Sequence, residues 1–228
     1  EDAGADSVAI KDMAGLLKPN AAFELVSKLK ENISVPIHMQ THATTGFSTA
    51  TNMKAIEAGI DNIDTSISSM SMTYGHTATE TIIAMFDDTK IFSDIDRNLF
   101  PELSSHFKRI RKKYELYEGS LKGVDASMLI NQVPGGMLSN LESQLREMDA
   151  DDKFEDVLNE IPRVRQDLGF VPLVTPSSQI VGAQALFNVL DGERYKHLNI
   201  ETVNLILGKY GKVPGKINKN LSSLAKKV

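Results

Sequence analysis

Two short stretches near the start of the chain bring together side chains that can do chemistry. In the first, an apolar run ends in Lys11 and Asp12. In the second, His38, Gln40 and His42 stand at every second position. Because successive side chains of a β-strand point to opposite faces, these three residues share one face of the strand. The pattern predicts a lysine and a row of potential metal ligands at one edge of a sheet.

Lys11 is compatible with several kinds of chemistry. A lysine at the end of a strand can act as a base or form a Schiff base, and after carboxylation by CO2 it can bind a metal. The structural alternative is an ion pair with Asp12, and the spacing favours neither role.

The histidines of the second stretch suit a transition metal. Zinc takes histidine nitrogens at about 2.0–2.1 Å, and histidine together with oxygen ligands also suits manganese or cobalt. His42 lies nearest the following loop and is the first candidate ligand. His38 lies deeper in the strand, where we expect it to pack or to support a ligand.

Thr175 is the strongest candidate in the second half of the chain. It precedes Pro176 and two serines. Its hydroxyl can donate and accept a hydrogen bond at once, which suits a proton shuttle, and its structural alternative is a helix N-cap. Two weaker candidates lie in the first half: residues 64–66, which end a strand, and residues 74–76, which precede a helix where anions can bind.

Alternating strands and helices must position the first group of residues. Predicted strands cover residues 7–10, 35–42 and 60–67, and predicted helices cover residues 19–33, 48–58 and 81–86, the last opened by a capping box at residues 77–80. Strands that alternate with helices pair in parallel and present equivalent ends at one edge. A complete eight-unit barrel needs about 200 residues or more, but this rhythm is confined to residues 1–95. The sequence therefore predicts an α/β fold, either a doubly wound sheet or at most half of a (β/α) barrel.

The second half is predicted to be all helical. Helices are expected at residues 101–118, 138–148, 151–168, 176–191 and 201–207, with a kink or break at Pro162. Residues 208–228 are rich in Gly, Pro and Lys and are expected to form a tail or linker. The predicted domains are residues 1–95, 96–207 and 208–228.

The composition excludes several classes of function. The 228 residues include no cysteine, which excludes disulfides and thiolate chemistry and fits a cytoplasmic setting. The formal net charge of −5 argues against nucleic acid as the main partner. No apolar run approaches the roughly 18 residues of a membrane span. Because a strand is expected within a few residues of Glu1, we expect that an N-terminal part is missing.

Several long motifs resemble the carboxyltransferases of biotin-dependent enzymes. Lys-Asp-Met-Ala stands at residues 11–14, Ala-Thr-Thr-Gly at 43–46, Ser-Ser-Met-Ser-Met-Thr-Tyr-Gly-His at 68–76, Gln-Val-Pro-Gly-Gly-Met at 132–137 and Thr-Pro-Ser-Ser at 175–178. The family includes pyruvate carboxylase, the large transcarboxylase subunit and the α subunit of oxaloacetate decarboxylase. The amino-acid sequences of these motifs are most similar to those of the decarboxylase α subunit.

The resemblance implies a fold, a cofactor set and roles for individual residues. It implies a (β/α)8 barrel, here only its C-terminal part, followed by a helical domain that closes over the barrel mouth. Lys11 would be carboxylated and would bind a divalent metal (zinc, cobalt or manganese) together with positions 40 and 42. Thr175 would pass a proton between biotin and pyruvate, and Ser178 and Gln179 would also contact the biotin.

Two departures from the family pattern bear on activity. Gln40 occupies a position where the family usually has histidine, and its neutral carbonyl oxygen is a poorer zinc ligand. The family's first barrel strand, with an aspartate ligand, and the arginines that hold the keto acid would lie before Glu1. The chain also lacks an Ala-Met-Lys-Met biotinylation motif, so biotin would come from a separate carrier domain.

We therefore predict carboxyl transfer between oxaloacetate or pyruvate and carrier-bound biotin, through a pyruvate enolate, with the 228 residues inactive alone. The expected partners are a biotin carboxyl carrier domain, the missing N-terminal half of the barrel, a keto acid, further copies of the chain and membrane decarboxylase subunits. Two alternatives compete with this function. One is an aldolase or acyl-CoA lyase type of barrel enzyme, and the other is a metal-poor, non-catalytic assembly subunit, which Gln40 favours.

Overall fold

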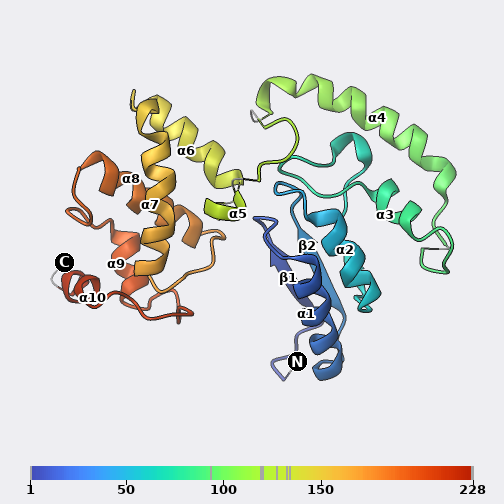
Figure 1. The fold of residues 1–228 in the computed structure, drawn as a ribbon, viewed down its shortest axis with the longest axis horizontal. Coiled ribbons are helices and arrows are strands. Elements are labelled where there is room, and N and C mark those ends of the chain that lie inside the picture. The colour runs from blue at the N-terminus through green and yellow to red at the C-terminus, as the bar shows by residue number, and fades with distance from the viewer. Residues whose placement is uncertain are drawn as a thin grey trace. The chain divides into compact units, whose positions relative to one another are not determined.

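The computed structural model describes residues 2–92, 94–118, 121–126, 128–131, 133 and 135–226. The chain divides into two compact units, Glu1–Leu129 and Ile130–Val228 (Figure 1). Each unit has its own core.

The first unit is built on a three-stranded parallel sheet. Strands β1 (Val8–Asp12), β2 (Ile37–Thr41) and β3 (Asn62–Ile63) follow one another in the order β1-β2-β3. Helices α1 (Pro19–Asn32) and α2 (Ser48–Glu57) connect them. In this register Lys11 lies beside Gln40, and Asp12 lies beside Thr41. The predicted parallel pairing of the first two strands is confirmed.

Helices α1 and α2 cover one face of this sheet (Figure 1). Val26 of α1, Met39 of β2 and Ala55 of α2 are fully buried against one another. The alternate residues of β2, His38 and Gln40, are only half-buried on the opposite face. The strand therefore has the predicted alternation, with apolar side chains toward the helices and polar side chains away from them.

The third strand is shorter than predicted. Beyond β3 the described residues form one isolated parallel bridge, between Ser66 and Ala78, and the chain then enters the 3-10 helix η1 (Ser68–Met70). Helix α3 (Thr79–Met85) has Ala78 as its N-cap, without a side-chain hydrogen bond, so the predicted capping box is wrong. The Glu80 carboxylate instead accepts a hydrogen bond from the Ser68 amide at 2.8 Å, which ties η1 to α3.

Helix α4 (Phe100–Lys113) belongs to the first unit, whereas the predicted boundary after residue 95 placed it in the helical domain. The short 3-10 helices η2 (Arg97–Leu99) and η3 (Glu115–Tyr117) flank it. The Ser104 hydroxyl lies 2.9 Å from that of Ser68, and Arg111 donates to the Ser69 carbonyl at 3.0 Å. Because α4 packs on η1, the boundary between the two units lies after Leu129 instead of after residue 95.

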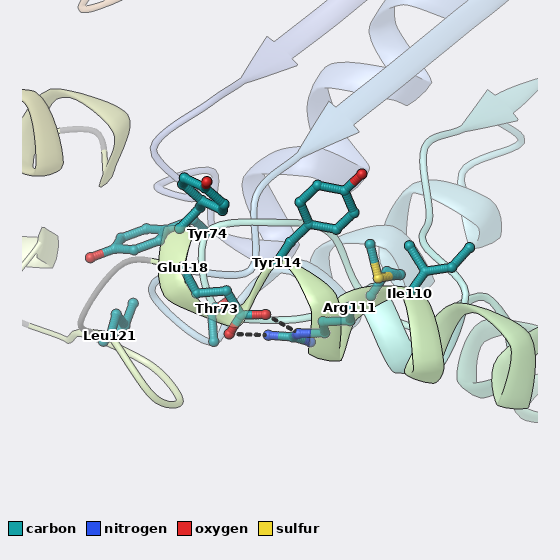
Figure 2. A pocket seen from close by; sticks show the side chains of 9 residues that line it. Thr73, Tyr74, Ile110, Arg111, Tyr114, Glu118 and Leu121 are labelled. Carbon is teal, nitrogen blue, oxygen red and sulfur yellow. Dashed lines mark hydrogen bonds and ion pairs between the residues drawn. The ribbon is translucent and has the colours of Figure 1, made fainter.

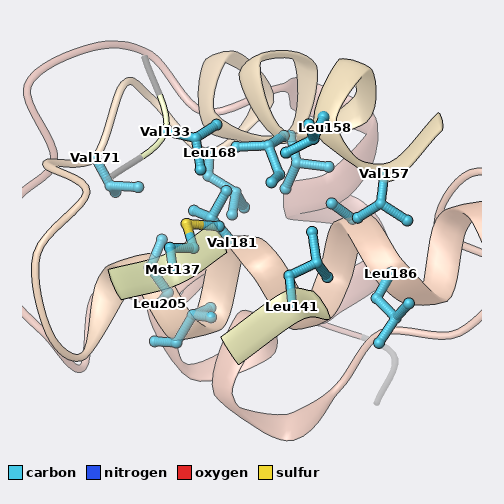
Figure 3. Packing of buried hydrophobic residues seen from close by; sticks show 14 of the residues in the cluster. Val133, Met137, Leu141, Val157, Leu158, Leu168, Val171, Val181, Leu186 and Leu205 are labelled. Carbon is cyan, nitrogen blue, oxygen red and sulfur yellow. The ribbon is translucent and has the colours of Figure 1, made fainter. Parts of the chain in front are cut away.

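The second unit is helical, as predicted. It contains α6 (Gly135–Glu147), η4 (Asp151–Lys153), α7 (Phe154–Asp167), α8 (Ser177–Leu190), α9 (Ile200–Ile206) and α10 (Lys219–Ala225), and the short α5 (Met128–Asn131) lies where the two units join in sequence. Apolar side chains of α6 to α9 pack together in one core, in which Val157, Leu168 and Val181 are fully buried (Figure 3). Helix α7 continues as one helix through Pro162, without the predicted break. Gln132 and Pro134, which belong to the motif at residues 132–137, lie outside the described residues.

The prediction of a tail or linker over residues 208–228 is wrong for much of this segment. Leu221 and Ala225 of α10 are buried in the core of the second unit. The Gly215 amide donates to the Gly169 carbonyl at 2.8 Å, and the Asn218 amide donates to the Asp167 carbonyl at 2.8 Å. Leu221 and Ala225 are one helical turn apart, which is the spacing of a buried helix face. The Gly, Pro and Lys content of the segment obscured this signal. Among the described residues, no helix is long and apolar enough to cross a membrane.

Candidate active site

Lys11 and Asp12 point to opposite faces of the sheet because they are adjacent in β1. The Asp12 carboxylate accepts hydrogen bonds from the amides of Leu16 and Leu17 at 2.9 and 3.0 Å, and from the Thr41 hydroxyl at 2.8 Å. Asp12 therefore shapes the turn after β1 and does not pair with Lys11. Lys11 itself is exposed and makes no hydrogen bond or ion pair with a described residue.

The loops after β1 and β2 are bonded to each other, which places Lys11 and His42 at the same end of the sheet. The His42 amide donates to the Asp12 carbonyl at 3.0 Å, and the Thr45 hydroxyl donates to the Gly15 carbonyl. Gly15 has φ +67°, and a Cβ there would overlap the His42 carbonyl oxygen. The close approach of the two loops therefore requires glycine at this position.

His42 is oriented by a backbone carbonyl. Its Nδ1 lies 2.6 Å from the Tyr74 carbonyl oxygen. Because a carbonyl can only accept, Nδ1 carries the hydrogen and Nε2 remains available to a ligand. Burial lowers the pKa of His42, and the neighbouring His76 and Lys11 lower it further, although the Tyr74 hydrogen bond opposes them. His42 is thus neutral at neutral pH, which is the form that binds metals.

Gln40 carries a buried oxygen without a donor. Among the described residues nothing donates to its Oε1, which is shielded from solvent. A buried polar atom left without a partner costs about 1–3 kcal/mol, so a cation or a donor group placed there would relieve this cost. Gln40 lies beside Lys11 in the register and on the same face of β2 as His38. The donor set of Lys11, Gln40 and His42 therefore fits a divalent cation with mixed oxygen and nitrogen ligands.

His38 is engaged elsewhere. Its Nε2 lies 2.7 Å from Oδ1 of Asp64, which follows β3, and both side chains are partly exposed. This pair connects β2 to the segment after β3. His38 Nε2 is therefore occupied by Asp64, and a supporting role of His38 at the site stays a prediction.

His76 lies at the site, although the spacing pattern of the strands did not single it out. Its Nδ1 lies 3.0 Å from the Thr41 carbonyl oxygen, and its ring centre is 4.7 Å from that of His42 at a tilt of 46°. A histidine in the loop after the third predicted strand was the available signal, because such loops end at the same edge of a parallel sheet. Within the described residues, no three His, Asp or Glu side chains form a ready-made metal cluster.

A hollow of about 430 Å³ lies beside the loop that orients His42. Its lining comes from Thr73 and Tyr74 and from the end of α4 and the segment that follows it (Figure 2). Arg111 and Glu118 form a two-pronged ion pair at its wall (Figure 2). The hydrogen bonds that Arg111 makes with Glu118 and Ser69 hold the wall together, so the cation is not free to bind an anion.

Thr175 belongs to the second unit and is exposed. The bond to Pro176 is cis, and Pro176 is the N-cap of α8, without a side-chain hydrogen bond. The N-cap alternative for Thr175 is therefore wrong. Its hydroxyl makes no hydrogen bond with a described residue. The neighbouring Ser177 hydroxyl, by contrast, donates to the Val174 carbonyl at 2.7 Å.

Thr175 lines a hollow of about 230 Å³ together with Pro172, Tyr210 and Lys212. Of the three residues predicted to contact biotin, only Thr175 lies in this lining. Ser178 is buried in α8, and Gln179 is exposed on the same helix. Because the predicted ligands and Thr175 lie in different units, their meeting at one site stays a prediction.

The chain matches two family models in succession. Residues 1–106 match the model described as HMGL-like, and residues 128–228 match the conserved carboxylase domain. The chain is 51% identical over 222 residues to a pyruvate carboxylase subunit of Methanocaldococcus jannaschii. The matched region covers 97% of the chain and 39% of that protein. It is also 47% identical over 226 residues to the methylmalonyl-CoA carboxyltransferase 5S subunit of Propionibacterium freudenreichii. That matched region covers 98% of the chain and 44% of that protein. The chain therefore spans about two fifths of the length of these relatives.

Solved structures give the same result. The carboxyl transferase domain of Rhizobium etli pyruvate carboxylase with pyruvate has a TM-score of 0.91 and 30% identity, and the match covers 99% of the chain and 39% of that domain. A structure of the same domain with pyruvate and biocytin has the same TM-score, identity and coverage. The predicted resemblance to the carboxyltransferases of biotin-dependent enzymes is confirmed, and the greater likeness to the decarboxylase α subunit stays a prediction.

Proposed function

Because the chain is related along nearly its whole length to biotin-dependent carboxyltransferases, we propose that it forms part of an enzyme that moves a carboxyl group between a keto acid and biotin. The keto acid is oxaloacetate or pyruvate, and the biotin is attached to a separate carrier domain. In this proposal the three-stranded sheet is the C-terminal part of a (β/α)8 barrel, and the second unit is the helical domain that follows it.

The observation that carries the proposal is the buried Gln40 oxygen, which has no hydrogen-bond partner among the described residues and belongs to the residue beside Lys11 in the sheet. Carboxylated Lys11, Gln40 Oε1 and His42 Nε2 would hold a divalent zinc, cobalt or manganese ion. A bound ion supplies positive charge for the keto oxygen, which becomes negative as the carboxyl group leaves. The Tyr74 carbonyl and the Asp12 turn keep His42 and the end of β1 in place before the ion binds.

Thr175 is proposed to carry the proton that balances the transfer. When oxaloacetate gives its carboxyl group to a biotin nitrogen, that nitrogen loses its hydrogen and the methylene carbon of the remaining enolate gains one. A hydroxyl can accept the first proton and donate its own to the carbon. The Thr175 hydroxyl is exposed and has no partner among the described residues, so it is available for both hydrogen bonds.

Exchange of label between radioactive pyruvate and oxaloacetate tests the proton relay in the full-length protein. Thr175→Ala removes the hydroxyl and should lower the biotin-dependent exchange by about 10²-fold or more. Thr175→Ser keeps a hydroxyl and should retain most of the exchange. Metal content should be the same in all three proteins because Thr175 is not a proposed ligand. Equal exchange by the Ala variant would remove Thr175 from the mechanism.

A non-catalytic assembly subunit is the second candidate function. The neutral Gln40 and the lack of a three-residue His, Asp or Glu cluster among the described residues favour it. Metal analysis of the full-length protein separates the two functions, since the enzyme should hold one ion per chain and the assembly subunit none. A barrel enzyme of the acyl-CoA lyase type is disfavoured by the match of residues 128–228 to the conserved carboxylase domain.

A further inference from the structure

We propose that His76 is a metal ligand in this protein and supplies the second imidazole that position 40 lacks. The inference rests on the proposed function, because it concerns the same divalent ion. It goes beyond that function because neither the strand pattern nor the proposed ligand set includes His76.

The two histidines are presented in the same way. His42 Nδ1 donates to the Tyr74 carbonyl, and His76 Nδ1 donates to the Thr41 carbonyl. In both rings Nε2 makes no hydrogen bond with a described residue. A backbone hydrogen bond at one ring nitrogen is the usual way in which a protein fixes a histidine so that the other nitrogen can bind a metal.

The distance between the rings is suitable for one shared ion. An ion about 2.1 Å from each Nε2 lies about 3.2 Å from each ring centre, so rings that make angles of roughly 90–109° at the ion have centres about 4.5–5.2 Å apart. The observed separation of 4.7 Å falls in this range. The tilt of 46° between the rings is not that of a parallel stack.

Both rings are held by one ladder of hydrogen bonds. The end of β2 and the loop that carries His76 exchange three contacts: His76 to the Thr41 carbonyl, His42 to the Tyr74 carbonyl, and the Ala43 amide to the Gly75 carbonyl at 2.8 Å. Neither ring can move far without breaking this ladder. The two imidazoles are therefore positioned together before any ion arrives, which favours joint ligation.

With His76 the donor set no longer depends on Gln40 alone. It would comprise oxygen atoms from carboxylated Lys11 and from Gln40, and nitrogen atoms from His42 and His76. Such a mixed set suits zinc, cobalt or manganese. The simpler role for His76 is that of a loop anchor, which the Thr41 hydrogen bond alone would explain.

Metal binding by the full-length protein distinguishes a ligand from an anchor. His76→Gln should weaken the affinity for Co²⁺, measured by titration of the metal-free protein, by about tenfold or more. The matched control is His106→Gln, because His106 is exposed on α4 and its ring makes a T-shaped contact with that of Phe107. The control should bind Co²⁺ as the wild type does. Equal affinity for His76→Gln and the wild type would show that His76 is only an anchor.

Two further measurements cover the case in which His76→Gln disturbs the loop. The Gln40→His/His76→Gln double variant should regain the lost affinity, since it restores two imidazoles, whereas a failure to regain it would count against the inference. X-ray absorption of the wild type loaded with Co²⁺ needs no variant and should count two imidazoles, and a count of one would overturn the inference alone. No Co²⁺ binding by the wild type would overturn the proposed function as well.

Discussion

At the scale of single residues, the site depends on how closely the loops after β1 and β2 approach. Gly15→Ala should destabilise the protein by about 1–3 kcal/mol, because alanine is strained at φ +67° and its Cβ would meet the His42 carbonyl oxygen. Urea unfolding of the full-length protein measures the effect. Gly59→Ala is the matched control, since its φ is +85° but a Cβ there meets nothing within 4 Å. An equal loss for both variants would mean that the close approach contributes nothing beyond backbone strain.

Residue types and spacing predicted the neighbours of the site better than their roles. The alternation of His38 and Gln40 was correct because it follows from strand geometry alone, whereas β2 ends at Thr41, one residue before His42. The role of Asp12 was not predictable, because it is decided by the amides of the turn that follows. Residues 74–76 were only a weak candidate for anion binding, and the place of His76 beside His42 was missed because its contact with Thr41 joins residues far apart in the chain.

At the scale of elements, Asp167 joins the end of α7 to the loop before α9 and to the segment before α10. Its carboxylate accepts hydrogen bonds from Arg194 and Tyr195 at 2.8 Å and from Asn218 at 2.9 Å. Burial acts to raise the pKa of Asp167, but these hydrogen bonds and the Arg194 charge outweigh it, so the pKa lies below its usual range. The ionised carboxylate therefore contributes to the stability of the second unit.

This pKa shift predicts an acid-dependent stability. Because the folded-state pKa of Asp167 is below the unfolded value of about 3.9, its contribution is present above that value and is lost as the pH falls through the folded-state pKa. Asp167→Asn should cost about 1–3 kcal/mol at neutral pH. The difference in thermal midpoint from the wild type should shrink in acid. Glu147→Gln, at an exposed residue without an ion pair among the described residues, should show neither effect. A midpoint difference that is constant with pH would contradict the assignment.

Elements with a strong internal pattern were predictable, and those set by distant contacts were not. Helices α1, α2 and α8 begin and end within about two residues of their predicted bounds, because their apolar stripes and their Pro and Gly signals are local. The short β3 was overestimated, because the chain leaves the sheet to enter η1. The assignment of α4 to the wrong domain has the same origin, since only its packing on η1 through Ser104 and Arg111 reveals where it belongs.

At the scale of the whole molecule, the candidate chemistry is divided between two units with separate cores. Lys11, Gln40 and His42 belong to the first, and Thr175 belongs to the second. The relatives are more than twice as long as the chain, which covers 39% and 44% of the first two. Complete activity is therefore a property to be tested on the full-length protein and compared with the 228 residues alone.

The 228 residues alone should not decarboxylate oxaloacetate faster than free metal ions do. Lys11 and Ala9, on the face of β1 that carries the candidate ligand, are exposed, whereas carboxyl transfer needs a site that excludes water. Oxaloacetate consumption with biotin and Co²⁺ measures this, with the same Co²⁺ concentration without protein as the control and the full-length protein as the positive case. Rapid turnover by the 228 residues would contradict the prediction. It would mean that the residues of the two units are sufficient for a complete site.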